Sequence, residues 1–156
     1  MRKHFFNYLS KLARYDKNII FLTGDLGYGY FEEFRDRFPR QFINCGCIEQ
    51  TMLGIAAGLA RSGKKPYVYS TIPFLIMRAY EQVRSDICYQ NLNVKMFGVS
   101  MSGFLGFSHN LQNGEFEEYL LGILPNLNTY YPISQIEIEK DMLKEYKRNG
   151  PAYIRI

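Results

Sequence analysis

The sequence predicts an α/β fold: a three-layer, doubly wound, mostly parallel six-stranded sheet with helices on both faces. Two observations predict this class. Apolar runs of strand length alternate along the chain with segments whose apolar residues recur at helical spacing. This alternation favours parallel strands, because each crossover helix returns the chain to the same end of the sheet. The length of 156 residues suits one domain with a full core, so we expect a single domain over residues 1–156.

Apolar spacing and helix breakers define the elements of the first half. Phe5 and Leu9 share one side of a helix, and a polar break at 16–18 precedes an apolar run. Pro39 and Gly63 stop the two later helices. In chain order, the predicted elements are a helix around 5–13, a strand at 19–22, a short helix at 31–38, a strand at 42–44, a helix at 48–61 and a strand at 67–69.

The second half of the chain continues the alternation. An apolar run bounded by Val94 and Val99 predicts a strand that leads into a loop punctuated by glycines. In chain order, the predicted elements are a helix at 74–89, a strand at 94–99, a helix at 115–124, an extended segment at 128–131, a helix at 134–147 and a strand at 152–156.

Composition excludes several classes of protein. The net charge of +4 comes from basic residues interleaved with acidic ones, which disfavours nucleic-acid binding. No apolar run approaches the ~20 residues that cross a bilayer, and the N-terminal residues lack the apolar stretch of a secretory signal. Three cysteines, an odd number, do not make a disulfide framework. We therefore expect a cytoplasmic protein with no membrane or nucleic-acid partner.

Cys45 and Cys47 form a C-x-C pair, which raises the question of a metal site. Zinc sites usually combine two such pairs or add histidines nearby, and the two histidines of this chain lie far away in the sequence. We expect small, packed thiols and no metal ligands.

In a parallel α/β sheet, ligands bind at the carboxyl ends of the strands. The first loop to inspect holds the run 24–29, which contains three glycines but does not have the G-x-G-x-x-G spacing of a dinucleotide site. It is either a tight strand-to-helix turn or a place where Asp25 and Leu26 border a ligand.

Glu49 lies in the first turn of a helix otherwise built from apolar and small residues. A carboxylate there is favoured by the helix dipole alone, by about 0.3–1 kcal/mol. Two features point beyond that explanation. Gly54 and Gly58 each cost the helix ~1 kcal/mol, which indicates that a close backbone approach is needed there. The carboxylate also follows a strand, where functional sites form.

Three further residues are candidates at these strand ends. Phe74 is either a core residue or an aromatic platform for a flat ring. Arg78 belongs either to a solvated helix face or to the site. His109, in the glycine-punctuated loop, is a candidate hydrogen-bond donor or proton carrier.

Together, these segments resemble the pyrimidine-binding domain of the transketolase family of thiamine diphosphate enzymes. The resemblance covers nearly the whole chain, and the order and spacing of its pieces make it specific. The matching segments are 24–26, 46–50, 74, 78–84, 106–109, 124–126 and 150–156.

The resemblance implies a role for each candidate residue. Glu49 falls where the family keeps a glutamate that hydrogen-bonds the aminopyrimidine ring and favours its imino tautomer, and Phe74 resembles the aromatic residue that stacks on that ring. Asp25 and Leu26 match positions near the thiazolium. Arg78 joins this cofactor-binding set, near a position where relatives contact the substrate. His109 resembles a catalytic histidine that contacts a sugar phosphate.

Part of the family's pattern is missing. The chain has no Gly-Asp-Gly followed some ~25–30 residues later by Asn, the motif that holds Mg²⁺ and the diphosphate in relatives, and the residues after His109, beginning with Asn110, differ from the usual pattern. We therefore expect a split small subunit without the diphosphate-binding domain or the third, C-terminal domain. A separate subunit would hold thiamine diphosphate and Mg²⁺, this chain itself would bind no metal, and two copies of each would assemble.

The expected reaction is transfer of a two-carbon ketol unit between sugar or sugar-phosphate substrates. The alternatives are a subunit of an enzyme similar to 1-deoxyxylulose-5-phosphate synthase, a subunit of a 2-oxo acid dehydrogenase, and a non-catalytic pairing or regulatory module.

Overall fold

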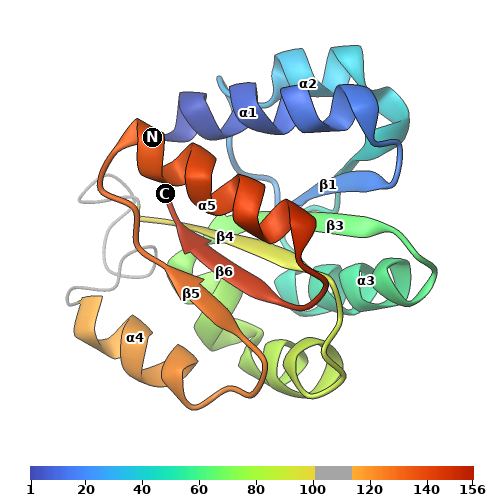
Figure 1. Cartoon of the computed structure of the whole chain (residues 1–156). Coiled ribbons are helices and arrows are strands. Elements are labelled where there is room, and N and C mark those ends of the chain that lie inside the picture. Colours follow the sequence, from blue (N-terminus) through green and yellow to red (C-terminus); the bar gives the residue numbers. More distant parts are fainter. Residues whose placement is uncertain (101–113) are drawn as a thin grey trace.

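The computed structural model describes residues 1–100 and 114–156, and these form an α/β domain around one sheet (Figure 1). The described residues contain six strands, all of them parallel to their neighbours, in the order β2-β1-β3-β4-β6-β5. The strands are β1 (Ile19–Thr23), β2 (Phe42–Asn44), β3 (Lys65–Thr71), β4 (Lys95–Val99), β5 (Asn128–Tyr130) and β6 (Ala152–Arg155). The predicted fold class is confirmed, and the sheet is wholly parallel where a mostly parallel one was predicted.

Helices cover both faces of this sheet, which gives the predicted three layers. α1 and α5 lie side by side over one face, and α3, α4 and the helical turns after β3 lie over the other (Figure 1). The helices are α1 (Arg2–Tyr15), α2 (Glu32–Arg37), α3 (Glu49–Arg61), α4 (Gly114–Gly122) and α5 (Gln135–Lys147), with a 3₁₀ turn, η1 (Pro39–Gln41), and two π-helical segments, η2 (Phe74–Arg78) and η3 (Gln82–Cys88).

The two faces of the sheet bury separate apolar clusters. One cluster is rich in aromatic rings, including Phe5, Phe21 and Phe97, and lies under α1 and α5. The other is mostly aliphatic, includes Leu53 and Ile76, and lies under α3 and the π-helical segments. Strands β1 and β4 are buried along their whole length, which explains why they appear in the sequence as continuous apolar runs.

The strand order reverses between β1 and β3, because β2 lies on one side of β1 and all later strands lie on the other. Such a switch point is where doubly wound sheets bind their ligands, beyond the carboxyl ends of the strands. Thr23 of β1 pairs with Asn44 of β2 and with Tyr69 of β3, so these three strands end close together. The fold thus places the loops after them around one location.

The segment after β3 differs from the prediction of one regular helix at 74–89. Its two π-helical segments are separated near Ala79, whose φ of −112° and ψ of 25° interrupt the helix. Apolar spacing alone cannot distinguish α turns from wider π turns, since both present apolar residues to the core at similar intervals. Wide π turns are frequent at functional sites, and this segment carries Phe74 and Arg78.

A buried ion pair fastens the amino end of the sheet. Lys95, the first residue of β4, and Glu145 of α5 are 2% and 1% exposed, with the Lys95 Nζ 3.3 Å from Glu145 Oε2. The ammonium also donates to the carbonyls of Arg148 and Gly150. Burial lowers the pKa of Lys95 to about 8, although the Glu145 charge opposes that shift. Neither residue of this pair was predicted from the sequence.

A second buried polar cluster joins β6 to α4. The Tyr153 hydroxyl donates to the buried Glu117 carboxylate, whose other oxygen lies 3.3 Å from Arg155 Nη1. Burial raises the pKa of Glu117, and the bond from Tyr153 and the charge of Arg155 oppose the shift. Gly98 of β4 leaves room for the Tyr153 ring, because a Cβ at position 98 would overlap its hydroxyl.

We expect Gly98→Ala to destabilise the domain by about 2 kcal/mol, because a methyl group forced against a fully buried ring overpacks the core. For a chain of this length, the midpoint of thermal unfolding should fall by about 4–8 °C. Gly122→Ala is the matched control, since a Cβ at position 122 meets nothing within 4 Å. An unchanged midpoint in Gly98→Ala would show that Tyr153 has space to move.

Candidate functional site

The candidate site is built around Glu49, the first residue of α3, which follows the carboxyl end of β2. A carboxylate in the first turn of a helix is usually exposed, yet Glu49 is only 1% exposed. Burial of a charged carboxylate is costly unless it is paired and hydrogen-bonded. Its partners therefore define the site.

Each oxygen of Glu49 has a partner from the β3 side of the switch point. The Ser70 hydroxyl, near the end of β3, donates to Oε1 at 3.3 Å. Arg78 Nη1, at the end of η2, donates to Oε2 at 2.9 Å. Gly24, just after β1, closes the third side, because a Cβ there would lie 3.1 Å from Oε1. Three strand ends thus hold one carboxylate in a fixed position.

Phe74 lies beside this carboxylate through its contact with Arg78. The guanidinium carbon of Arg78 is 3.6 Å from the centroid of the Phe74 ring, a close cation–π arrangement. The Arg78 carbonyl accepts a hydrogen bond from the Gln50 side chain at 3.1 Å, which ties η2 to the first turn of α3. The structure therefore brings Glu49, Phe74 and Arg78 together, as expected from the sequence for a common site.

Asp25 lies at the neighbouring strand end in an unusual backbone conformation, with a φ of +58°. Hydrogen bonds hold it there: the Tyr28 hydroxyl and the Asn44 amide both donate to Oδ1, at 2.5 and 3.0 Å. The bond from Tyr28, followed by that from Asn44, lowers the pKa of Asp25. Positive φ in a non-glycine residue is uncommon and often found at functional sites.

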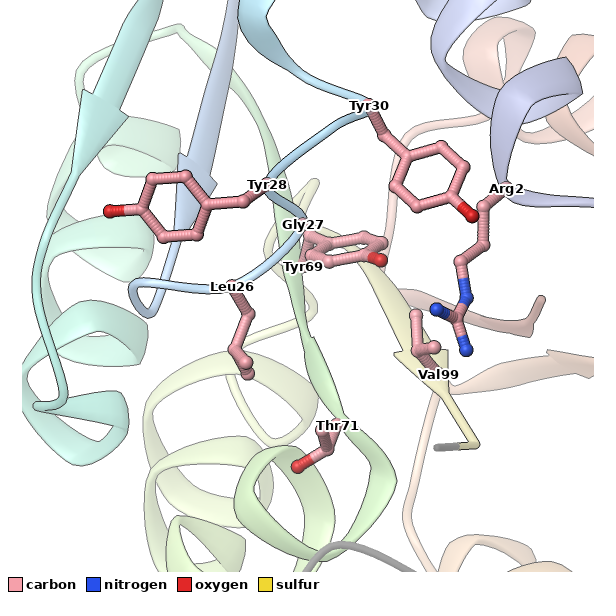
Figure 2. A pocket seen from close by; sticks show the side chains of 8 residues that line it. All are labelled: Arg2, Leu26, Gly27, Tyr28, Tyr30, Tyr69, Thr71 and Val99. Carbon is pink, nitrogen blue, oxygen red and sulfur yellow. The ribbon is translucent and has the colours of Figure 1, made fainter. Parts of the chain in front are cut away.

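Leu26 lines a pocket of about 170 Å³ at the same edge of the sheet (Figure 2). Its carbonyl accepts a hydrogen bond from Thr23 at 2.6 Å, which fixes the turn. Figure 2 shows Leu26 and Arg2 on opposite sides of this pocket. The Thr71 hydroxyl is buried and has no hydrogen-bond partner within the part of the chain that the structure describes. The pocket is lined by Arg2, Leu26, Gly27, Tyr28, Tyr30, Tyr69, Thr71 and Val99.

The remaining predicted residues have different outcomes. His109 lies outside the described residues, so its role stays a prediction. Cys45 and Cys47 are free thiols, Cys45 half-buried and Cys47 exposed, so the expectation that they are packed holds only for Cys45. Within residues 1–100 and 114–156, no group of three His, Cys, Asp or Glu side chains could hold a metal ion. In the same residues, no helix is both long and apolar enough to cross a membrane.

Several residues that complete the site were not predicted from the sequence. Ser70 and Gly24 contact Glu49, while Tyr28 and Asn44 hold Asp25. Their positions were the available signal, because each lies at or just after the carboxyl end of a predicted strand. Serine, glycine and asparagine are so common in turns that residue type alone did not distinguish them.

The fold and the site define a doubly wound α/β domain with a buried carboxylate and an aromatic ring at its switch point. The model of the family described as "Transketolase, pyrimidine binding domain" matches residues 1–156. The chain belongs to the transketolase family and corresponds to its pyrimidine-binding domain.

Relatives of this chain include both split and longer enzymes. One of the separate subunits of an apulose-4-phosphate transketolase, from Phocaeicola vulgatus, is 37% identical over 161 aligned positions, which cover 99% of this chain and 50% of that protein. A 1-deoxy-D-xylulose-5-phosphate synthase of Aromatoleum aromaticum is 36% identical over 97% of this chain and 24% of that protein. The chain thus spans half or less of these curated relatives.

Solved structures give the same result for the fold. A structure described as a split gene transketolase, inactive β4 tetramer, superposes with a TM-score of 0.87 and 32% identity, covering 99% of this chain and 50% of that one. The transketolase of Campylobacter jejuni superposes with a TM-score of 0.84 at 18% identity, over 99% of this chain and 25% of that one. The second likeness shows the fold alone.

Proposed function

We propose that this chain is the pyrimidine-binding part of a split transketolase-like enzyme. The enzyme transfers a two-carbon ketol unit between sugar or sugar-phosphate substrates and uses thiamine diphosphate. The observation that carries the proposal is the nearly fully buried Glu49, held at the switch point beside Phe74. Membership of the transketolase family supports it.

The residues present fit an aminopyrimidine ring. A flat, nitrogen-bearing group already lies against Phe74 and hydrogen-bonds Glu49, because the Arg78 guanidinium does both. Gly24 leaves the space that a Cβ would fill next to Glu49. In the proposed enzyme, Glu49 holds a proton at a ring nitrogen and Phe74 orients the ring by stacking. Bound thiamine diphosphate supplies the carbon nucleophile of ketol transfer.

The other predicted residues complete this assignment. Asp25 and Leu26 lie at the adjacent strand end, where we place them beside the thiazolium half of the cofactor. The fixed backbone of this turn, held by Tyr28 and Asn44, suits a positioning role. His109 is proposed to contact the sugar substrate.

We propose that a separate subunit binds the diphosphate and Mg²⁺. The Gly-Asp-Gly…Asn motif is missing from this sequence, which supports a division of the site between chains. One relative is named as a single subunit of its transketolase, and a solved split-gene relative is described as an inactive β4 tetramer. Three free cysteines support the cytoplasmic location that was expected from the sequence.

Reconstitution with the partner tests the proposal. The chain is co-purified with the protein that binds it, and the complex is mixed with thiamine diphosphate, Mg²⁺, a donor ketose phosphate and an aldose acceptor. We expect ketol transfer by the complex and none by either protein alone. If calorimetry detects no cofactor binding in any pairing, the chain is a non-catalytic module and the proposal is wrong.

A second function, a synthase-type condensation, is favoured by the 36% identity to 1-deoxy-D-xylulose-5-phosphate synthase. The same complex is therefore assayed with pyruvate as donor. Turnover with pyruvate and none with a ketose phosphate would replace the ketol-transfer assignment with a condensation or an oxidative decarboxylation.

The exposed face of α3 is our candidate for contact between copies in a two-plus-two assembly. Gly54 and Gly58 lie on this face, and a Cβ at either position would meet nothing within 4 Å. The close packing that was expected at these glycines is therefore not provided by the described part of this chain. A second chain could provide it, because a face without side chains allows two helix backbones to approach closely.

Gly58→Leu is expected to leave the fold intact and to disrupt this assembly. Leucine favours the helix by up to ~1 kcal/mol over glycine, so the thermal midpoint should not fall. Its side chain would, however, separate the paired helices. Light scattering of the complex should show a halved mass for Gly58→Leu and a smaller change for Gly58→Ala. A native mass for Gly58→Leu would place the interface on another face.

A further inference from the structure

We propose that the Arg78 side chain is a built-in competitor for the cofactor's ring: it occupies Glu49 and the Phe74 face and must swing away when the ring binds. This inference rests on the proposed function and assigns Arg78 a role different from the cofactor-binding one that the resemblance implied.

The two contacts of Arg78 are those that a bound aminopyrimidine needs. The guanidinium is planar, and its carbon lies 3.6 Å from the Phe74 ring centroid, a stacking distance for a flat group. Its Nη1 donates to Glu49 Oε2 at 2.9 Å. A ring cannot stack in this place and bond the same oxygen while the guanidinium is there. Arg78 and the ring therefore exclude one another.

Burial explains why Glu49 needs a stand-in before the cofactor arrives. A carboxylate with 1% of its side chain exposed is strongly destabilising when its charge has no partner. The Ser70 hydroxyl contacts only the other oxygen, Oε1, at 3.3 Å. The Arg78 charge therefore stabilises the empty site.

Arg78 can leave without moving the backbone. Its side chain is 45% exposed, so the guanidinium has a short path to water. Its carbonyl stays bound to the Gln50 side chain at 3.1 Å, which holds the backbone of η2 against α3. The motion is thus a change of side-chain rotamer at a fixed main chain.

Competition of this kind lowers the apparent affinity for the cofactor by the fraction of molecules in which Arg78 has swung out. Removing the side chain should therefore strengthen cofactor binding, whereas a residue that simply contacts the cofactor would weaken binding when removed. The two roles predict changes of opposite sign.

The first measurement uses the full chain without cofactor. Thermal midpoints are compared for wild type, Arg78→Ala, Glu49→Gln and the double variant. We expect Arg78→Ala to lower the midpoint by about 2–4 °C, and to have a clearly smaller effect when Glu49→Gln is already present. Additive effects would show that the Arg78–Glu49 contact is not formed in solution and would overturn the inference, whatever the enzyme's function.

The second measurement is calorimetric titration of thiamine diphosphate with Mg²⁺ into the complex with the partner subunit. We expect about tenfold tighter binding for Arg78→Ala. Arg78→Lys should give a smaller gain, because lysine pairs with Glu49 but presents no plane to Phe74. Arg84→Ala, at an exposed arginine further along the same segment, is the control and should bind like wild type.

Equal or weaker binding by Arg78→Ala overturns the competition while leaving the proposed function in place. An absence of binding by wild type and all variants alike would instead overturn the proposed function, and the competition with it.

Discussion

Glu49→Gln is expected to reduce ketol transfer by the reconstituted enzyme by at least about 10²-fold, the low end of what a positioned acid or base contributes. Glutamine matches the size of glutamate but cannot hold a proton at the ring nitrogen as a carboxyl group can. Both oxygens of Glu49 now accept hydrogen bonds, from Ser70 and Arg78, and the glutamine amide nitrogen cannot replace either acceptor. Initial rates at saturating cofactor measure the effect.

The control for this experiment is Glu81→Gln, at an exposed glutamate that removes the same charge from the helical segment carrying Arg78. We expect it to keep wild-type rates. Thermal unfolding should confirm that Glu49→Gln is folded, so that a loss of rate is not a loss of protein. If Glu49→Gln turns over at the wild-type rate, the role assigned to Glu49 is wrong.

Glu145→Gln is expected to have the largest effect on stability, about 3–5 kcal/mol, because it leaves the buried Lys95 ammonium without its counter-charge. The side chains of Asn128, Tyr130 and Arg148 also donate to this carboxylate, and a glutamine amide would turn a donor toward some of them. Urea unfolding at pH 7 measures the loss. The matched control is Glu139→Gln on the same helix, whose ion pairs are partly exposed and which should cost less than about 1 kcal/mol.

The effect of Glu145→Gln should depend on pH. Burial alone would raise the pKa of Glu145, but bonds from Asn128 and Tyr130 and the Lys95 charge outweigh it and lower the pKa. A carboxylate with a lowered pKa stabilises the fold above its ordinary pKa of 4.5, and this contribution is lost as the pH falls through the lower, folded-state pKa. The difference between wild type and variant should therefore shrink below about pH 4. A difference that stays constant down to pH 3 would contradict the assignment.

The sequence predicted the strands well where they are wholly apolar. The run at 19–22 became Ile19–Thr23 and the run at 42–44 became Phe42–Asn44. The strand at 67–69 was predicted too short, since it extends over Lys65–Thr71 and its polar ends do not look like a buried strand. Those ends are polar for a reason: Lys65 pairs with Asp16, and Ser70 contacts Glu49.

The core of the site was also predictable, because position in the fold limits where a ligand can bind. Glu49, Phe74 and Arg78 were singled out by their places after strands, and the structure brings them together. The direct pairing of Arg78 with Glu49 was not predictable, since it depends on the π turns of η2, which leave no mark in apolar spacing.

Buried charges were the feature that the sequence predicted least well. Glu145 shares its buried helix face with Ile138 and Met142, at spacings of three and four residues, and Glu117 precedes the buried Leu121 by four. A carboxylate in register with apolar residues is thus a signal of burial. Recognising it requires the partner as well, and Lys95 lies fifty positions from Glu145 in the chain.

The two ends of the strands have different tasks, and this division affects how the protein can evolve. The buried Lys95–Glu145 pair secures the end where β4 begins, while the carboxylate of Glu49 lies where β2 has ended. Most substitutions lower stability, and lineages lose those that fall below the threshold for folding. Because the anchoring charges are remote from the ligand loops, substitutions in those loops can alter substrate preference without removing the anchor. Related enzymes with new sugar specificities can therefore arise on this scaffold by loop changes alone.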